Sequence, residues 1–194
     1  MPWKELFSAA ALVLTFVIFV PYIRSIRGGR TRPHLFSWII WGLGTFVIFL
    51  AQLAGGGGIG AWPIGVSGLI TFYVAWLAWT HRADTTVTRS DWMFFLAALA
   101  AIPAWVFTAD PLWAVVILTT VDTAGFGPTF RSAWVSPHSE RIGFYALAAV
   151  RNLLVVLALE HYSVTTVLFP AVVGIGSLSL AGLIAFRRGS MRSF

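Results

Sequence analysis

Two ionisable side chains lie inside long apolar runs, Asp122 in residues 112–130 and Arg151 in residues 141–160. A charged side chain at the centre of a bilayer costs roughly 2.5 to 3.5 kcal/mol on insertion scales, so it is retained mainly when paired or functional. Asp122 lies eight residues from one end of its run and Arg151 ten from the matching end. At about 1.5 Å per residue, both lie about 12 to 15 Å deep. The shared depth allows a charge-assisted pair, which is either a structural link or part of a working site.

Other reactive chemistry finds little support in the composition. There is no cysteine, and the four histidines fall between the apolar runs, so thiolate metal sites and cysteine nucleophiles are excluded. The single lysine, Lys4, lies near the chain start, which excludes a retinal Schiff base within a helix. Asn152, next to Arg151, is either a hydrogen-bonding partner of a solute or a contact between helices. We therefore expect no enzyme, no catalytic residue, no metal and no cofactor.

The elements that must hold these residues are membrane-spanning helices. The chain has 194 residues, of which 58% are hydrophobic and 10% charged, and its mean hydropathy is +0.84. A bilayer core needs roughly 20 apolar residues per helix. Seven runs satisfy this requirement: 6–23, 35–54, 60–80, 92–108, 112–130, 141–160 and 164–186. The sequence thus predicts an all-α integral membrane protein with seven transmembrane helices, in which the bilayer is a partner.

The positions of the basic residues predict the orientation. Eleven of the 13 lie on the side where the odd-numbered runs end: Arg24, Arg27, Arg30, Arg32, Arg82, Arg89, Arg131, Arg141, Arg187, Arg188 and Arg192. Because loops rich in arginine stay in the cytoplasm, we expect the N-terminus outside and the C-terminus inside a plasma (inner) membrane. The net charge of +6 is then a topology signal, and no nucleic-acid partner is expected.

An internal repeat relates the two halves of the chain. At an offset of 107 residues, residues 19–25 align with 126–132, and both read F-x-P-x-x-R-S. The first three runs then fall on the last three, and the unmatched fourth run restores a parallel orientation. The predicted domains are a first triple-helix repeat at 6–81, a linker with the fourth helix at 82–111, a second repeat at 112–188, and a cytoplasmic tail at 189–194.

Two pairs of prolines occupy matched places in the repeats. Pro21 aligns with Pro128, and Pro63 aligns with Pro170. A proline inside a helix lacks a backbone donor and frees a carbonyl one turn earlier, so each site is expected to kink its helix. A kink of this kind is either static curvature or a hinge, and its recurrence in both halves favours a hinge.

The pattern resembles the PQ-loop superfamily, which includes the SWEET sugar transporters and the lysosomal amino-acid exporters. The resemblance is carried by Pro21-Tyr22-Ile23-Arg24-Ser25, by Pro128-Thr129-Phe130-Arg131-Ser132 and by Ser37-Trp38 at the start of the second run. It implies two parallel triple-helix bundles joined by an inverting helix, in a three plus one plus three plan. It also implies alternating access, with a solute cavity between the bundles and the four prolines as hinges.

The same resemblance implies further site residues. Trp41 would face the cavity, and Thr71 and Ser177 are polar residues in the third and seventh runs, where sugar-transporting members carry asparagine. With Asp122, Arg151 and Asn152 they form the expected binding or coupling set. We expect a transporter of a small polar solute, sugar-like or amino-acid-like. The alternative is a receptor or sorting protein that binds a ligand without moving it, and assembly with a second copy is left open.

Overall fold

A computed structural model describes residues 2–81, 87–138 and 140–192, with the side chains of residues 128 and 192 excepted. Every regular element within these ranges is helical. In chain order the elements are α1 (Pro2–Arg27), α2 (Leu35–Ala54), the 3-10 turn η1 (Gly58–Ala61), α3 (Trp62–Thr80), α4 (Arg89–Thr108), α5 (Pro111–Ala124), α6 (Phe126–Val135), α7 (Ile142–Ala158) and α8 (Val164–Arg192).

Five helical segments of the described chain are long and apolar enough to cross a membrane. They are α1, α2, η1 with α3, α4, and α8. The chain is therefore an all-helical integral membrane protein, as its composition indicates. The prediction of seven full-length spans needs correction at one place. The run expected at 112–130 is broken, so that α5 has only 14 residues. The helix within the run 141–160, α7, has 17 residues, which is at the lower limit of about 17 for a span.

The break between α5 and α6 falls at Gly125, one turn before Pro128. Pro128 has no N–H to donate to the carbonyl of Ala124, the last residue of α5, so the regular ladder stops there. Gly125 donates instead to the Asp122 carbonyl at 3.1 Å. Asp122 therefore lies at the end of a short helix, and a depth counted along one straight helix does not apply to it.

Local sequence signals explain where several helices begin. The His34 side chain accepts from the Ser37 backbone N–H at α2. Thr88 and Asp91 form a capping box at α4. At α5 the Asp110 side chain accepts from Leu112, and proline occupies the start of the helix. Caps of this kind satisfy backbone donors that have no partner within the helix.

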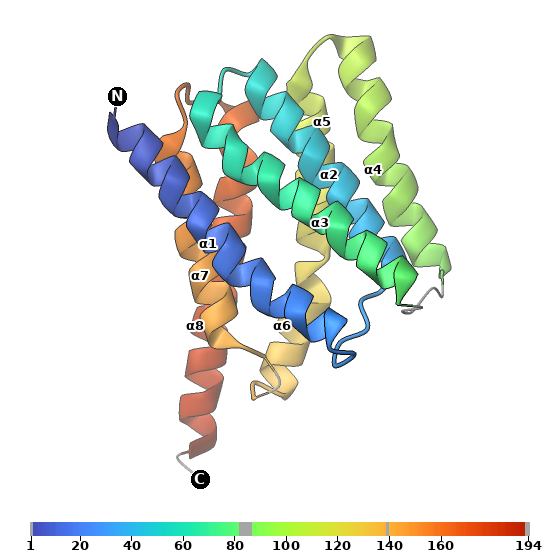
Figure 1. Ribbon diagram of the computed structural model, residues 1–194, viewed down its shortest axis with the longest axis vertical. Coiled ribbons are helices and arrows are strands. Elements are labelled where there is room, and N and C mark those ends of the chain that lie inside the picture. Colours follow the sequence, from blue (N-terminus) through green and yellow to red (C-terminus); the bar gives the residue numbers. More distant parts are fainter. Residues whose placement is uncertain (1, 82–86, 139, 193–194) are drawn as a thin grey trace.

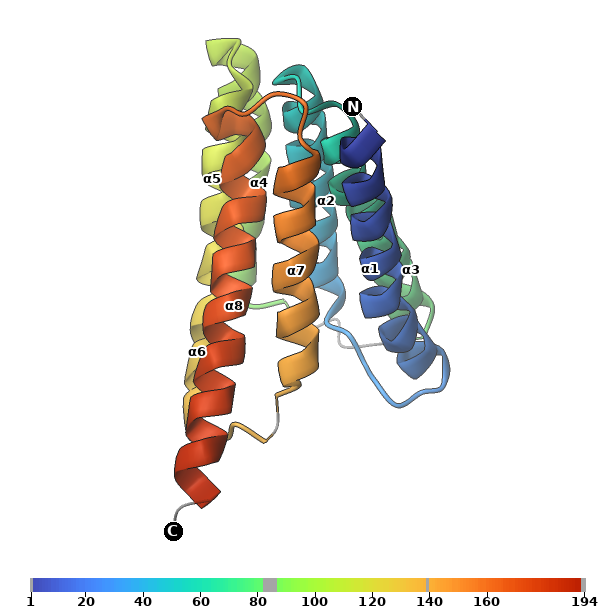
Figure 2. The same cartoon turned by 90° about the vertical axis from the view of Figure 1, so that its left-hand side faces the viewer.

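The helices form two groups with α4 at one side (Figures 1 and 2). We call α1, η1, α2 and α3 the first half, and α5 to α8 the second half. Within the first half α3 packs against both α1 and α2, and within the second half α8 packs against α7, α5 and α6. The halves meet where α1 packs against α7 and α2 against α5, while α4 packs against α5 and α2.

The two ends of the molecule differ in chemistry. The "turn end" carries the start of α1, η1 and the connection from α7 to α8. The "basic end" carries the connections from α1 to α2 and from α6 to α7, and the end of α8 (Figure 2). α1, α3, α5, α6 and α8 run from the turn end to the basic end, whereas α2, α4 and α7 run back (Figure 1).

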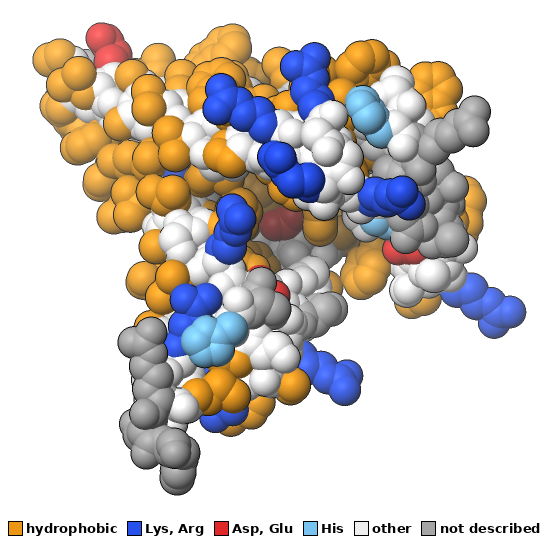
Figure 3. Space-filling view, turned by 60° about the horizontal axis from the view of Figure 1, so that its bottom comes forward, with side chains coloured by type: hydrophobic (Ala, Val, Ile, Leu, Met, Phe, Trp, Pro, Cys, Tyr) orange, Lys and Arg blue, Asp and Glu red, His pale blue; other side chains and the backbone are white. Residues whose placement is uncertain are grey.

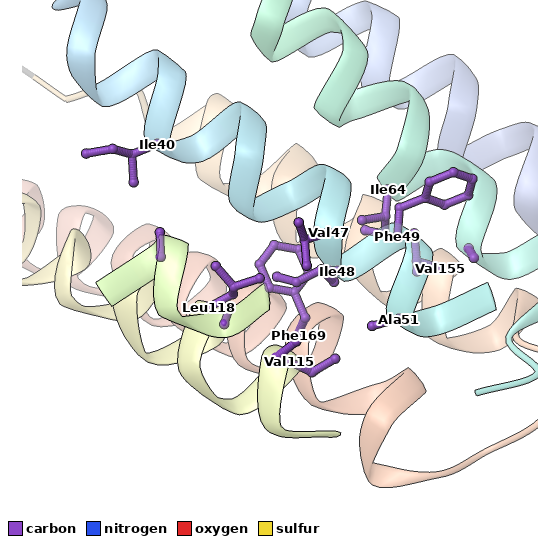
Figure 4. Packing of buried hydrophobic residues seen from close by; sticks show 14 of the residues in the cluster. Ile40, Val47, Ile48, Phe49, Ala51, Ile64, Val115, Leu118, Val155 and Phe169 are labelled. Carbon is purple, nitrogen blue, oxygen red and sulfur yellow. The ribbon is translucent and has the colours of Figure 1, made fainter. Parts of the chain in front are cut away.

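The apolar core joins the halves at the turn end and divides at the basic end. Its main cluster draws on both halves, with Ile48 and Phe49 from α2, Val115 from α5 and Phe169 from α8 (Figure 4). Toward the basic end there are two separate clusters. Ile26, Val74 and Leu77 form one in the first half, and Ala133, Leu180 and Ile184 form the other in the second half. The halves are thus tightly packed together at one end only.

Candidate functional site

A cavity of about 480 Å³ lies between the two halves. Its walls come from α1, α2 and α3 on one side and from α5, α6, α7 and α8 on the other. They include Tyr22, Trp38 and Tyr145 near the basic end, and Thr15 and Arg151 farther in. A view onto the basic end shows a hollow, with lysine or arginine side chains around it and an acidic side chain in its depth (Figure 3). The cavity therefore opens at the basic end.

All six residues of the predicted binding set line this one cavity. Trp41 comes from α2, Thr71 from α3, Asp122 from α5, Arg151 and Asn152 from α7, and Ser177 from α8. Arg151 is only 7% exposed and Asn152 only 2%, whereas Asp122 is half-buried. The structure thus brings together residues that lie up to 136 positions apart in the sequence.

The direct pair that depth allowed between Asp122 and Arg151 is absent among the described residues. The Arg151 guanidinium donates from Nε to Thr15 Oγ1 at 3.2 Å, from Nη1 to Asn152 Oδ1 at 3.2 Å and from Nη2 to the Pro63 carbonyl at 2.7 Å. The Asp122 carboxylate receives no hydrogen bond from any described residue. The prediction of a pair is wrong for this conformation.

Helix packing explains why the two charges stay apart. α7 packs against α1, so Arg151 reaches Thr15 and the start of α3; α5 packs against α2, so Asp122 faces the other side of the cavity. A narrow crevice beside Asp122 is lined by Gly44 and Thr45 of α2. A sequence pattern can match depths, but it does not tell which helices are neighbours.

The neutral polar residues of the set are largely engaged with the backbone. Asn152 Nδ2 donates to the Ala148 carbonyl at 2.8 Å, and Thr71 Oγ1 donates to the Ser67 carbonyl at 2.8 Å. Thr15 Oγ1 likewise donates to the Ala11 carbonyl at 2.8 Å. The hydrogen bonds of the Asn152 side chain thus join residues of α7 alone within the described chain, and its two expected roles, solute partner and contact between helices, stay predictions.

Aromatic side chains form much of the cavity wall on the side of the first half. Tyr22 stacks on Trp38 with ring centroids 5.1 Å apart, and Trp38 meets Trp41 edge to face at 5.5 Å. The ring centroid of Phe19 lies 6.4 Å from that of Trp38. Sequence reasoning selected only Trp41 from this group. The signal available for the others was the shared motif, since both Phe19 and Tyr22 lie within it.

Hydrogen bonds between the halves close the turn end. Lys4 Nζ donates to the Leu159 carbonyl at 2.6 Å, just beyond the end of α7. Glu160 N donates to the Gly57 carbonyl at 3.1 Å, and Glu160 Oε1 accepts from Ile59 N at 3.3 Å. The sequence analysis missed these contacts, because Lys4 and Glu160 lie outside the apolar runs or at their edges and carry no motif.

A fully buried glutamine makes another bond between the halves. Gln52 Nε2 on α2 donates to the Thr166 carbonyl on α8 at 2.7 Å, and neither residue is exposed. Thr166 is one turn before Pro170, which lies inside α8 and has no N–H for that carbonyl. The glutamine amide thus replaces the missing backbone donor.

The four prolines do not share one local geometry. Pro21 and Pro170 lie inside their helices, as expected. Pro63, however, is the second residue of α3 and follows the η1 turn directly, so the expected position inside a helix is wrong there. The Ile59 carbonyl, one turn before Pro63, accepts from the Trp62 backbone N–H and from Ser8 Oγ, the latter at 2.7 Å. Pro128 lies in the first turn of α6, after the break described above.

Comparisons with family models, with curated proteins and with solved structures found no match to this chain.

Proposed function

We propose that this chain is a carrier that moves a small polar solute across a membrane by alternating access between its two halves. One observation carries the proposal. The cavity between the halves reaches the surface at the basic end, while packing and hydrogen bonds hold the halves together at the turn end. This is the form of a carrier whose site is open to one side of the membrane. Separation of the two halves at the turn end, with closure at the basic end, would open the site to the other side.

The helix contacts support two equivalent bundles in a three plus one plus three arrangement. In the proposed alignment α1 corresponds to α5 with α6, α2 to α7, and α3 to α8. The third helix of each bundle packs against the other two, and the contact of α1 with α7 has its counterpart in the contact of α5 with α2. α4 runs opposite to α5 and returns the chain between the bundles (Figure 1).

The offset of 107 residues also supports the repeat within the site. Many residues that line the cavity occur as pairs at this offset. They are Thr15 and Asp122, Ile18 and Gly125, Phe19 and Phe126, Tyr22 and Thr129, Trp38 and Tyr145, Trp41 and Ala148, and Thr45 and Asn152. The two clusters near the basic end are related in the same way, through Ile26 with Ala133 and Leu77 with Ile184.

These features favour membership of the PQ-loop superfamily, with residues 6–81 and 112–188 as the two repeats. By the positive-inside rule the basic end would face the cytoplasm of a plasma membrane, so the conformation described would be open inward. α5 and α6 together would make one crossing, and α7 another. Pro170 is the best supported hinge, because the Thr166 carbonyl that it leaves without a backbone donor accepts from Gln52 of the opposite half.

A test of the carrier combines flux with access. The chain has no cysteine, so Ser177→Cys introduces a single thiol in the cavity. We expect reconstituted vesicles to take up labelled solute, and we expect saturating solute to change the rate at which an impermeant reagent labels this thiol from each side. A cysteine at exposed Leu178 serves as the matched control. Solute binding without flux would instead favour the receptor.

A coupled test concerns Asp122, the half-buried carboxylate of the cavity. We expect Asp122→Asn to insert and fold but to abolish or uncouple uptake, because it removes the only acidic group in the cavity wall among the described residues. Glu5→Gln, which changes an exposed carboxylate at the start of α1, is the control. Unchanged uptake, with unchanged dependence on pH, would reduce Asp122 to a structural role.

A further inference from the structure

The cavity presents two opposite charges that the protein does not neutralise. Arg151 donates only to neutral oxygens, those of Thr15, Asn152 and Pro63. Asp122 receives no donor from the described residues. Both line the same space from different interfaces, Arg151 where α7 meets α1 and Asp122 where α5 meets α2. The cavity therefore has a positive side and a negative side.

The guanidinium retains donors for a ligand. It has five N–H groups, of which three are given to Thr15 Oγ1, Asn152 Oδ1 and the Pro63 carbonyl. One N–H remains on each terminal nitrogen, so the guanidinium still has donors to give to a carboxylate. Because the bond to the Pro63 carbonyl is 2.7 Å long, the side chain is held in place before any ligand arrives.

The neutral groups nearby offer less to a ligand. The hydroxyls of Thr15 and Thr71 and the amide of Asn152 already donate to backbone carbonyls. The remaining wall is mostly apolar and aromatic, with Trp41, Phe126 and Phe144 among its residues. A hydrogen bond to a charged group is roughly twice as strong as one between neutral groups. The two charges therefore dominate recognition, and the aromatic rings suit an apolar or an ammonium-bearing group.

We infer that the cavity binds a zwitterion, with its ammonium group at Asp122 and its carboxylate at Arg151. The inference rests on the carrier proposed above and selects one class from its small polar solutes. A lone cation would face Arg151 unpaired, and a lone anion would face Asp122. A neutral polyol would displace water from both charges without replacing it by an opposite charge. An amino acid or a betaine leaves neither charge unpaired.

The binding test uses purified protein and probes that differ in the charges they carry. The zwitterions are leucine, 4-aminobutyrate and 6-aminohexanoate, whose charges are progressively farther apart; the single charges are isoamylammonium and 4-methylpentanoate, and the polyol is glucose. Thermal stabilisation and calorimetry report binding. We expect at least one zwitterion to bind at least tenfold more tightly than either single-charge probe and than glucose. Glucose binding as tightly as every zwitterion, or no binding by any zwitterion, would overturn the inference.

Two variants separate the roles of the charges from their effects on folding. Asp122→Asn should weaken zwitterion binding at least tenfold while the binding of 4-methylpentanoate is kept or improved. Arg151→Gln should do the converse for isoamylammonium. The exposed residues Glu5 and Arg141 provide the controls, Glu5→Gln and Arg141→Gln, which should bind as the parent does. If Arg151→Gln does not fold, the change of preference in Asp122→Asn still decides. Equal weakening of all probes in Asp122→Asn would contradict the inference.

Measurements of solute uptake distinguish the inferred ligand class from the proposed carrier function. Uptake of glucose but of no zwitterion would support the proposed carrier function and refute the inferred preference for zwitterions. Binding of a zwitterion without uptake would support the inferred ligand class and refute the proposed carrier function. Failure of both binding and uptake with every probe would overturn both.

Discussion

The hydrogen bond from Gln52 to the Thr166 carbonyl offers the sharpest test of how the halves are held together. It is 2.7 Å long, fully buried, and joins α2 to α8. Its acceptor lacks a backbone donor because Pro170 follows one turn later. We therefore expect Gln52 and Pro170 to be energetically coupled although neither side chain needs to touch the other.

The magnitude follows from what each substitution leaves unpaired. Gln52→Leu exposes the Thr166 carbonyl to an apolar surrounding, which costs about 1 to 3 kcal/mol, but it also removes Gln52 Oε1, which is buried without a partner and carries a similar cost. The single variant therefore mixes two opposing effects. In the Pro170→Ala background the backbone N–H satisfies the carbonyl, so only the second effect remains. The difference between backgrounds isolates the hydrogen bond.

The assay is chemical unfolding of the four proteins in mixed micelles. We expect Gln52→Leu to be about 1 to 3 kcal/mol more destabilising beside Pro170 than in Pro170→Ala, which corresponds to about 5- to 150-fold in the equilibrium constant. A coupling within about 0.5 kcal/mol of zero would mean that the two sites are independent. The donor role that we assign to Gln52 would then be refuted.

Three further outcomes test other contacts. Arg151→Ala should lower the unfolding free energy of the protein, and adding Asp122→Asn should not restore it. The effects of the two changes on the unfolding free energy should add within about 0.5 kcal/mol. A larger favourable coupling between them would indicate an ion pair. Lys4→Ala should lower the unfolding free energy by about 0.5 to 2 kcal/mol, because it removes the cation bound to the Leu159 carbonyl; an unchanged value would show that this contact adds nothing. Gly60→Ala should lower the unfolding free energy by about 1 to 3 kcal/mol, and with it the melting temperature, because the added methyl group would lie 2.5 Å from Leu159 N. Gly182→Ala is the control, since its methyl group would enter open space and should not lower the melting temperature. Equal shifts in the two variants would contradict the close approach at Gly60.

Sequence reasoning located most helices because hydropathy acts over whole segments. The run at 35–54 coincides with α2, and the run at 164–186 lies within α8. It failed at 112–130, where one helix ends and another begins at Gly125, one turn before Pro128. Such a break depends on one backbone donor, and a hydropathy average over some 20 residues does not register it.

At the candidate site, sequence predicted which residues lie deep in the membrane but not which residues are their neighbours. Asp122 and Arg151 were found because a charge within an apolar run is costly wherever the helix lies. Their partners were not found, because Thr15 and the Pro63 carbonyl become neighbours of Arg151 only through the packing of α7 against α1. Contacts at the turn end, such as Lys4 with Leu159, join residues 155 positions apart and leave no local pattern.

The bond from Arg151 to Thr15 has an evolutionary consequence. On the proposed repeat, Thr15 occupies the position that Asp122 holds in the other half. In an ancestral dimer of two identical copies of residues 112–188, arranged as the halves are now, each arginine would meet an aspartate at that position. Both carboxylates would then be locked into internal pairs. On the proposed repeat, divergence of the two copies after duplication would leave one acid and one base in this chain unmatched.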